Sequence, residues 1–130
     1  MTFFTRALGL FAASAFCALL LAPSVHAQIT INEARNQGVG DSVTVDGTVT
    51  RAFGAYVRFQ DESGPTGASG LVVRQTSGSL SSDFQQDIQD GTISQGTELE
   101  VSGTLSEFNG LLQINNEDLG DYTVLGQGTL

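Results

Sequence analysis

The sequence predicts an all-β domain with one or two short helices, in which five strands close into a Greek-key barrel. Residues 43–54 and 99–110 each begin with apolar and polar side chains in alternation, the pattern of a half-buried antiparallel strand. Asn109-Gly110 suits a tight hairpin turn, because both residues tolerate positive φ. Both stretches carry a Gly-Thr pair, 56 positions apart. Two such hairpins favour a small barrel over a solenoid, which needs several repeats of shorter period.

Residues 1–27 have the pattern of a secretory signal peptide. An apolar segment of small and aliphatic residues ends at Pro23, and Val25-His26-Ala27 fits a small-residue cleavage site. We expect cleavage after Ala27 and export to the periplasm or the cell exterior, with no membrane association afterwards. A retained membrane anchor is the alternative, but the apolar run is shorter than the ~20 residues of a spanning helix.

The composition of residues 28–130 excludes several kinds of chemistry. The single Cys, His and Met of the sequence are Cys17, His26 and Met1, and Lys and Trp do not occur. Thiol, imidazole and amine catalysis and the usual zinc sites are therefore excluded. Four arginines stand against fourteen carboxylates, which gives a net charge of about −10 and disfavours tight nonspecific binding to nucleic acid. The length predicts one small domain, residues 28–130, with no disulfide.

A short helix and a long, bent strand are expected first. Thr30-Ile-Asn-Glu33 has the pattern of a capping box, so a helix should begin there and end before Gly38. The first strand covers 42–53, and Gly47 predicts a bulge or coil within it. Its inward residues are expected to be Val43, Val45, Val49 and Phe53.

The second and third strands are shorter and flank a turn-rich loop at 61–70. The second covers 56–60, with Val57 and Phe59 on one face and Tyr56, Arg58 and Gln60 on the other. The third covers 71–75, with inward Leu71 and Val73 and outward Val72 and Arg74.

A second helix precedes the last two strands. Ser82-Asp-Phe-Gln85 also matches a capping box, and Phe84 and Ile88 would form the apolar edge of a helix that ends at Gly91. The fourth strand should place Leu99, Val101 and Leu105 inward, the fifth covers 111–115, and a further short strand is expected at 122–125.

This order of three strands, a helix and two strands is that of the OB-fold, a five-stranded Greek-key barrel with its helix between strands three and four. A long first strand that bends at a glycine to pair with two neighbours fits this fold. A β-sandwich fragment is the alternative, and the single helix at this position argues against it.

Four segments resemble the OB-fold modules of exported bacterial proteins, of the type that accompanies secreted endonucleases and exonucleases. They are residues 43–49, 57–61, 70–73 and 101–114, within a similarity that covers about residues 29–127. A looser similarity is to small periplasmic bacterial OB-fold proteins. In the nuclease family, hydrolysis belongs to a separate, larger domain, so the resemblance implies an accessory binding role.

The ligand face of an OB-fold is the exterior of strands two and three, with the loops that join strands one to two and four to five. Aromatic and arginine side chains there suit stacking on bases or sugar rings and contacts to phosphate or carboxylate. Alternatively, Arg58 and Arg74 form a cross-strand pair near Asp61 that only makes the surface more soluble. Phe53 and Phe108 would then simply plug the ends of the barrel. The candidate ligand-binding residues are Phe53, Tyr56, Arg58, Gln60, Val72, Arg74, Phe108 and Asn109, with Arg51 nearby.

Other polar clusters give weaker signals. Residues 115–118 with Asp121 form an oxygen-rich turn that suits Ca²⁺, but the spacing is not that of an EF-hand, and a solvated acidic turn is the preferred interpretation. We expect no metal and no cofactor. No carboxylate pair is placed across an apolar cleft, so we expect no catalysis.

The sequence thus predicts an exported, non-catalytic OB-fold module that weakly binds single-stranded nucleic acid or a glycan, with an accessory role to a secreted nuclease as the narrower hypothesis. The alternative is a structural or protein-interaction module of the cell envelope with no small ligand.

Overall fold

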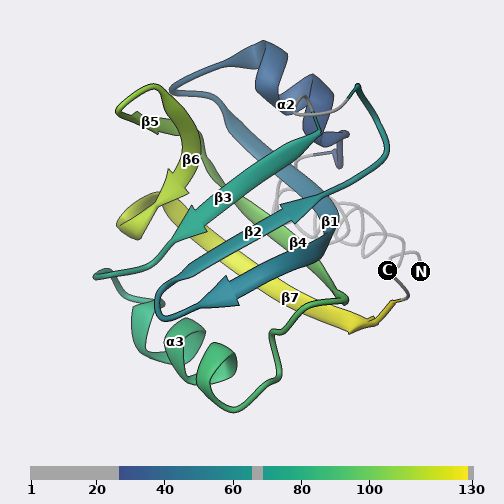
Figure 1. Cartoon of the computed structure of the whole chain (residues 1–130). Helices are drawn as coiled ribbons and strands as arrows, with labels where there is room; N and C mark the ends of the chain where they lie inside the picture. The colour runs from purple at the N-terminus through teal and green to yellow at the C-terminus, as the bar shows by residue number, and fades with distance from the viewer. Residues whose placement is uncertain (1–26, 66–68, 129–130) are drawn as a thin grey trace, which may run out of the picture.

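The computed structural model describes residues 27–65 and 69–128, so residues 1–26 of the expected signal peptide lie outside the described residues and the signal peptide stays a prediction. One seven-stranded sheet curls into a barrel-like body, with α2 beside one end and α3 beside the other (Figure 1). In this part of the chain no helix is long and apolar enough to cross a membrane. The elements are α2 (Ile31–Gln37), β1 (Ser42–Phe53), β2 (Tyr56–Gln60), β3 (Gly70–Arg74), α3 (Ser81–Gln89), β4 (Thr97–Thr104), β5 (Ser106–Phe108), β6 (Leu111–Asn115), the 3₁₀ helix η2 (Asn116–Asp118) and β7 (Leu119–Gln127).

The sheet has the order β5-β6-β3-β2-β1-β4-β7, and every neighbouring pair is antiparallel except β3 and β6. The barrel-like all-β fold is confirmed, but the predicted count of five strands is wrong. β5 extends the last hairpin, and the expected short strand at 122–125 is the nine-residue β7. Because β6 pairs with β3 and β7 pairs with β4, the continuous run β6-η2-β7 connects the two sides of the sheet.

Gly47 marks the bend of β1. Residues 42–48 of β1 pair with β4, and residues 48–53 pair with β2. A Cβ at Gly47 would lie 2.7 Å from Phe59 Cδ2 and 2.8 Å from the Gln60 carbonyl oxygen, so the close approach of β2 requires glycine. The long strand that bends to serve two neighbours is therefore confirmed.

The irregularity in the β1–β2 ladder lies between Val49 and Arg51 and not at Gly47, where the sequence placed it. This shift turns Ala52 toward the core and Phe53 outward, because it reverses the alternation for the rest of the strand. The inward position predicted for Phe53 is wrong, since its side chain is 71% exposed.

Gly103 plays a similar part in β4, where the ladder to β7 is irregular between Ser102 and Gly103. A Cβ there would lie 2.8 Å from Ile114 Cγ2 and 2.5 Å from the Asp118 carbonyl oxygen. The Asn109-Gly110 hairpin is also confirmed. Both turn residues have positive φ, 52° and 82°, and they join Phe108 to its cross-strand partner Leu111.

The core fills the barrel with the apolar side chains predicted from strand alternation. The helices close its ends: Ile31 and Ala34 of α2 and Phe84 of α3 are fully buried. The ring of Tyr122 on β7 packs edge-on against Phe84, with centroids 5.0 Å apart. The buried strand residues include Val43, Val45, Val49, Val57, Phe59, Leu71, Val73, Leu99, Val101, Leu105 and Ile114.

Only one of the two predicted capping boxes forms. The Thr30 side chain accepts from Glu33 N, and Thr30 N donates to Glu33 Oε2 at 2.8 Å. The capping box predicted at Ser82 does not form, because the N-cap of α3 lies two residues earlier, at Leu80, which makes no side-chain cap. The hydroxyl of Ser81 donates to the Gly78 carbonyl at 2.8 Å and helps to hold this helix start.

The 3₁₀ helix η2 is connected to the loop after β3 through Asn116. The Oδ1 atom of Asn116 accepts from Thr76 N at 3.0 Å and from Ser77 N at 3.1 Å. The carbonyl of Asn116 accepts from Nε2 of the buried Gln75 at 2.7 Å. These bonds join the β6–β7 junction to the chain that leads into α3.

Candidate ligand-binding face

The exterior of β2 and β3 presents the side chains that the sequence assigned to a ligand face. Tyr56, Arg58 and Gln60 are exposed on β2, between the buried Val57 and Phe59. The antiparallel register sets Tyr56 opposite Arg74 and Arg58 opposite Val72. Alternation along β2 and the ladder to β3 thus bring these residues to one face.

Two adjoining hollows lie on this face. The first, of about 280 Å³, is lined by Arg35, Arg58, Gln60, residues 69–72, Leu111 and Leu112. The second, of about 310 Å³, is lined by Arg51, Phe53, Tyr56, Val57, Arg58, Val72 and Leu111. Because the two share Arg58, Val72 and Leu111, they form one continuous depression, which we call the groove.

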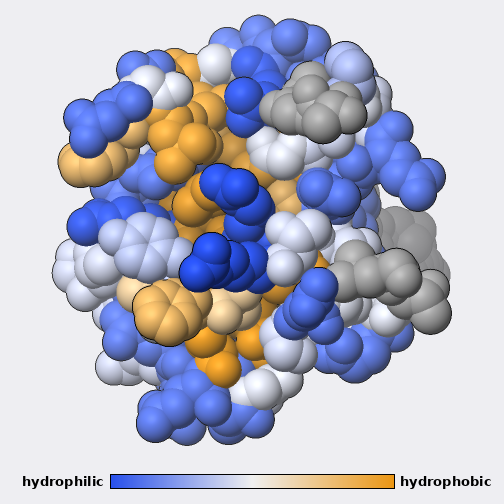
Figure 2. All heavy atoms as spheres, viewed as in Figure 1, coloured by the Kyte–Doolittle hydropathy of each residue, from blue (hydrophilic) through white to orange (hydrophobic). Residues whose placement is uncertain are grey.

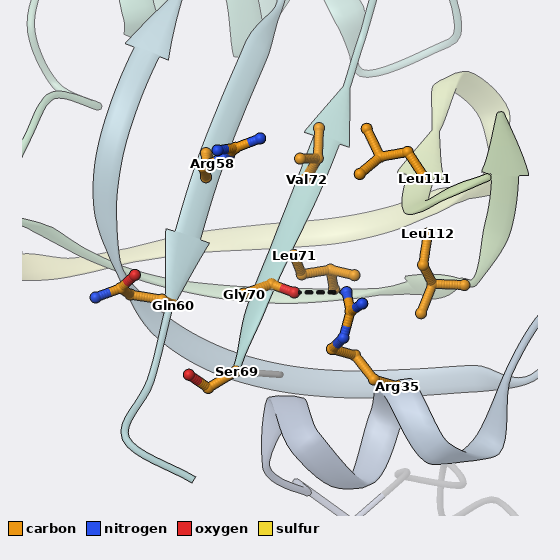
Figure 3. A pocket seen from close by; sticks show the side chains of 9 residues that line it. All are labelled: Arg35, Arg58, Gln60, Ser69, Gly70, Leu71, Val72, Leu111 and Leu112. Atoms are coloured by element: carbon orange, nitrogen blue, oxygen red, sulfur yellow. Dashed lines mark hydrogen bonds between the residues drawn. The ribbon is translucent and has the colours of Figure 1, made fainter. Parts of the chain in front are cut away.

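Val72 forms part of the floor of the groove. It points away from the barrel core, as predicted, yet only 8% of it is exposed. The cause is β6, which pairs in parallel with β3 and sets Gln113 beside Val72, while Leu111 faces the same hollow (Figure 3). The surface around the groove is apolar over β3 and β6 and strongly hydrophilic in the middle of the face (Figure 2).

Arg74 is held in place beside the groove. Its Nε donates to the Tyr56 hydroxyl at 3.2 Å, and its Nη1 donates to Asn115 Oδ1 at 2.8 Å. Its guanidinium carbon lies 5.9 Å from the ring centroids of both Tyr56 and Phe108. Cation–π contacts of this kind fix the two rings and the charge relative to one another.

Arg51 and Arg58 form a like-charge pair. They are direct cross-strand partners on β1 and β2. Neither guanidinium has a hydrogen-bond or salt-bridge partner among the described residues. Like charges directly opposite each other destabilise a sheet. The two arginines nevertheless lie opposite each other in a sequence that contains fourteen carboxylates. Two unpaired cations side by side in an acidic domain are the arrangement that an anionic ligand would neutralise.

The alternative roles suggested by the sequence do not fit these positions. Phe53 and Phe108 do not plug the barrel ends, since they are 71% and 55% exposed. The Asp61 carboxylate accepts from Ile31 N and from Ser63 N, so it holds α2 and its own loop. Asn109 lies at the tip of the β5–β6 hairpin and lines neither hollow.

Sequence reasoning missed Arg35, Leu111 and Leu112. Arg35 lies on α2, and its Nη1 donates to the Gly70 carbonyl at 3.0 Å, which brings the guanidinium to the start of β3 (Figure 3). Nothing in its local sequence marks it as a surface ligand. With Arg35, all four arginines of residues 27–65 and 69–128 lie in the groove or beside it.

The oxygen-rich turn considered for Ca²⁺ forms η2, where the side chain and the carbonyl of Asn116 are engaged as acceptors. In the described segments no three Asp, Glu, His or Cys residues are grouped so as to hold a metal ion.

Comparisons with known proteins support the fold. No protein-family model and no curated protein sequence matches this chain. Among solved structures, the chain is similar to an aspartyl-tRNA synthetase from Entamoeba histolytica, with a TM-score of 0.54 and 17% identity over 80% of this chain and 22% of that one. It is also similar to a putative aspartyl-tRNA synthetase from Leishmania major Friedlin, with a TM-score of 0.55 and 13% identity over 91% of this chain and 26% of that one.

This chain thus spans about a quarter of the length of these synthetases. The similarity and the strand pairing together support an OB-fold. They do not extend to the nuclease-associated type that the sequence resembles.

Proposed function

We propose that this chain is a binding module for single-stranded nucleic acid, with the strand lying along the groove. The observation that carries the proposal is the unpaired Arg51–Arg58 pair on a face that also holds exposed aromatic rings. Tyr56, Phe53 and Phe108 offer faces on which bases can stack, and the arginines meet phosphates. The structural neighbours are tRNA synthetases by name, which agrees with a nucleic-acid ligand.

Binding is expected to be weak and strongly dependent on salt. The groove is cationic, but the domain as a whole carries about ten net negative charges, which repel a polyanion at long range. For single strands, each phosphate contact contributes a slope of about −0.7 to the plot of log affinity against log salt. Contacts from Arg51 and Arg58 alone therefore predict a slope of about −1.4.

The experiment is a fluorescence anisotropy titration of labelled single-stranded DNA and RNA at low ionic strength. Arg58→Ala combined with Arg74→Ala should abolish most of the binding. Arg58→Ala is also measured alone, with Ser82→Glu as its charge-matched control, because each of these two changes the net charge by −1. Ser82 is exposed in the first turn of α3, where an acidic side chain is tolerated. If neither nucleic acid binds at low ionic strength, or if the control weakens binding as much, the proposal fails.

A second candidate is a protein-interaction module, which the sequence also suggested. Its support is the exposed apolar side chains in the groove and beside it: Phe53 and Leu111 line the groove, Phe108 lies next to it, and each is more than 40% exposed. Absence of binding to oligonucleotides and to a panel of glycans would favour this alternative. Export and an accessory role beside a secreted nuclease are proposals that rest on the sequence pattern alone.

A further inference from the structure

The groove has different ends. At the end near the β1–β2 turn, the second hollow is bordered by Phe53 and Tyr56, which are 71% and 46% exposed. At the other end, α2 lies beyond the start of β3, and its Arg35 reaches back to line the first hollow (Figures 1 and 3). A single nucleic-acid strand that enters the groove over these aromatic rings and runs along β3 therefore reaches this helix.

Several hydrogen bonds hold α2 in this position. Ile31 N donates to Asp61 Oδ2 at 2.8 Å, and Asn32 N donates to Ser63 Oγ at 3.0 Å. Ile31 is also fully buried in the core. Since these bonds tie the helix to the loop after β2, the wall at this end is a fixed part of the fold.

The first hollow, in front of α2, is lined by positively charged and polar side chains and, among the described residues, by no carboxylate. Arg35 and Arg58 both line it, with Gln60 and Ser69 as further polar residues. The bond to Gly70 uses one of the five N–H groups of the Arg35 guanidinium and orients the others. Asp61 follows directly after Gln60, but its carboxylate accepts hydrogen bonds from Ile31 N of α2 and from Ser63 N. The hollow, with a volume of about 280 Å³, has room for a phosphate group.

We propose that the first hollow binds the terminal phosphate of a single-stranded nucleic acid, so that the groove recognises a chain end rather than the middle of a strand. Arg35 and Arg58 hold the phosphate through charge-assisted hydrogen bonds, and α2 blocks the path of any further nucleotide. This inference rests on the proposed function and specifies its ligand.

The test compares the affinities of four thymidine ligands of the same length. One carries a 5′-phosphate, one a 3′-phosphate, one neither, and one is a closed circle. We expect one of the two terminal phosphates to tighten binding at least about fivefold over the unphosphorylated strand, and the circle to bind most weakly. Arg35→Gln should bring the ratio between phosphorylated and unphosphorylated strands close to one. Arg51→Gln is the matched control, because Arg51 lines only the second hollow and its loss should preserve that ratio.

Arg35→Gln also removes the bond to Gly70, so its melting temperature is measured beside that of Arg35→Lys, which keeps the charge but loses the planar fork. The lysine variant should retain part of the phosphate preference. Equal affinity for the circle and the linear strands, or a preference unaffected by Arg35→Gln, overturns end recognition while the proposed function stands.

If no oligonucleotide binds, the proposed function fails as well. Titration of inorganic phosphate, followed through the Nε–Hε resonances of the four arginines, then shows whether the hollow in front of α2 is an anion site of another kind. Perturbation of Arg35 and Arg58 together would identify such a site, and end recognition of nucleic acid would still be rejected.

Discussion

Gly47→Ala tests whether the bend of β1 depends on the absence of a side chain. Ordinary van der Waals contact begins at 3.4 Å, so a Cβ 2.7 Å from Phe59 Cδ2 and 2.8 Å from the Gln60 oxygen falls short by 0.7 and 0.6 Å. Phe59 is fully buried, and Gln60 is held in the ladder opposite Thr48, so neither can move without separating β1 from β2. The φ of Gly47 lies outside the left-handed region, which leaves the contact as the cause.

Overpacking of a well-packed site costs about 1–3 kcal/mol. A loss of about 2 kcal/mol would lower the melting temperature of a domain of this size by roughly 8–16 °C. The assay is thermal unfolding followed by circular dichroism, with Gly120→Ala as the control. Gly120 also lies in a strand, but its Cβ would meet only the Ser102 oxygen at an ordinary 3.4 Å. Equal melting temperatures for the two variants would refute the argument that close packing requires glycine at position 47.

Substitutions at three further residues test other contacts. Asn116 has a positive φ of 50°, and its side-chain oxygen accepts a hydrogen bond from Thr76 N. Asn116→Gly should lose only the side-chain hydrogen bonds, whereas Asn116→Ala should cost about 1 kcal/mol more in urea unfolding, because alanine is strained at positive φ. Equal costs for the two variants would contradict this. Burial and the facing Asp46 carboxylate raise the pKa of Glu100, so stability is lost as the pH rises through its folded-state pKa. Glu100→Gln should therefore raise the melting temperature at pH 7 and flatten its fall between mildly acidic and neutral pH; an unchanged pH profile would count against it. Tyr122→Phe removes the 2.7 Å bond to Asp87 and should cost about 1–2 kcal/mol in urea unfolding, while a cost near zero would show that this bond does not hold α3.

Local patterns predicted the elements whose side chains alternate without interruption. The bounds of β2 and the Asn109-Gly110 turn follow from the sequence alone, because alternation and positive φ are local properties. Phe53 was misplaced because the irregularity at residue 50 reverses the alternation, and its position depends on how β1 pairs with β2. Ser82 shows the reverse case: its segment matches a capping box, yet the helix begins two residues earlier, where Ser81 bonds to the Gly78 carbonyl.

The candidate face was predicted in its β2 and β3 residues and missed in the rest. Arg58 and Arg74 could be placed because OB-folds use that exterior surface. Arg35 joins them only because α2 packs at the start of β3, which is a long-range contact that no spacing in the sequence reports. Leu111 and Leu112 were expected as strand residues, and their part in the groove follows from the short parallel pairing of β6 with β3.

Every described arginine lies in the groove or beside it, so the molecule should orient itself in an electric field. No carboxylate of the described residues lines either hollow, so the arginines there separate positive charge from the rest of this acidic domain and give it a dipole moment directed through the groove. A phosphate-bearing matrix that binds this acidic protein should therefore hold it in a single orientation, with the groove facing the phosphates. A polyanion that approaches in solution would rotate the domain the same way before contact.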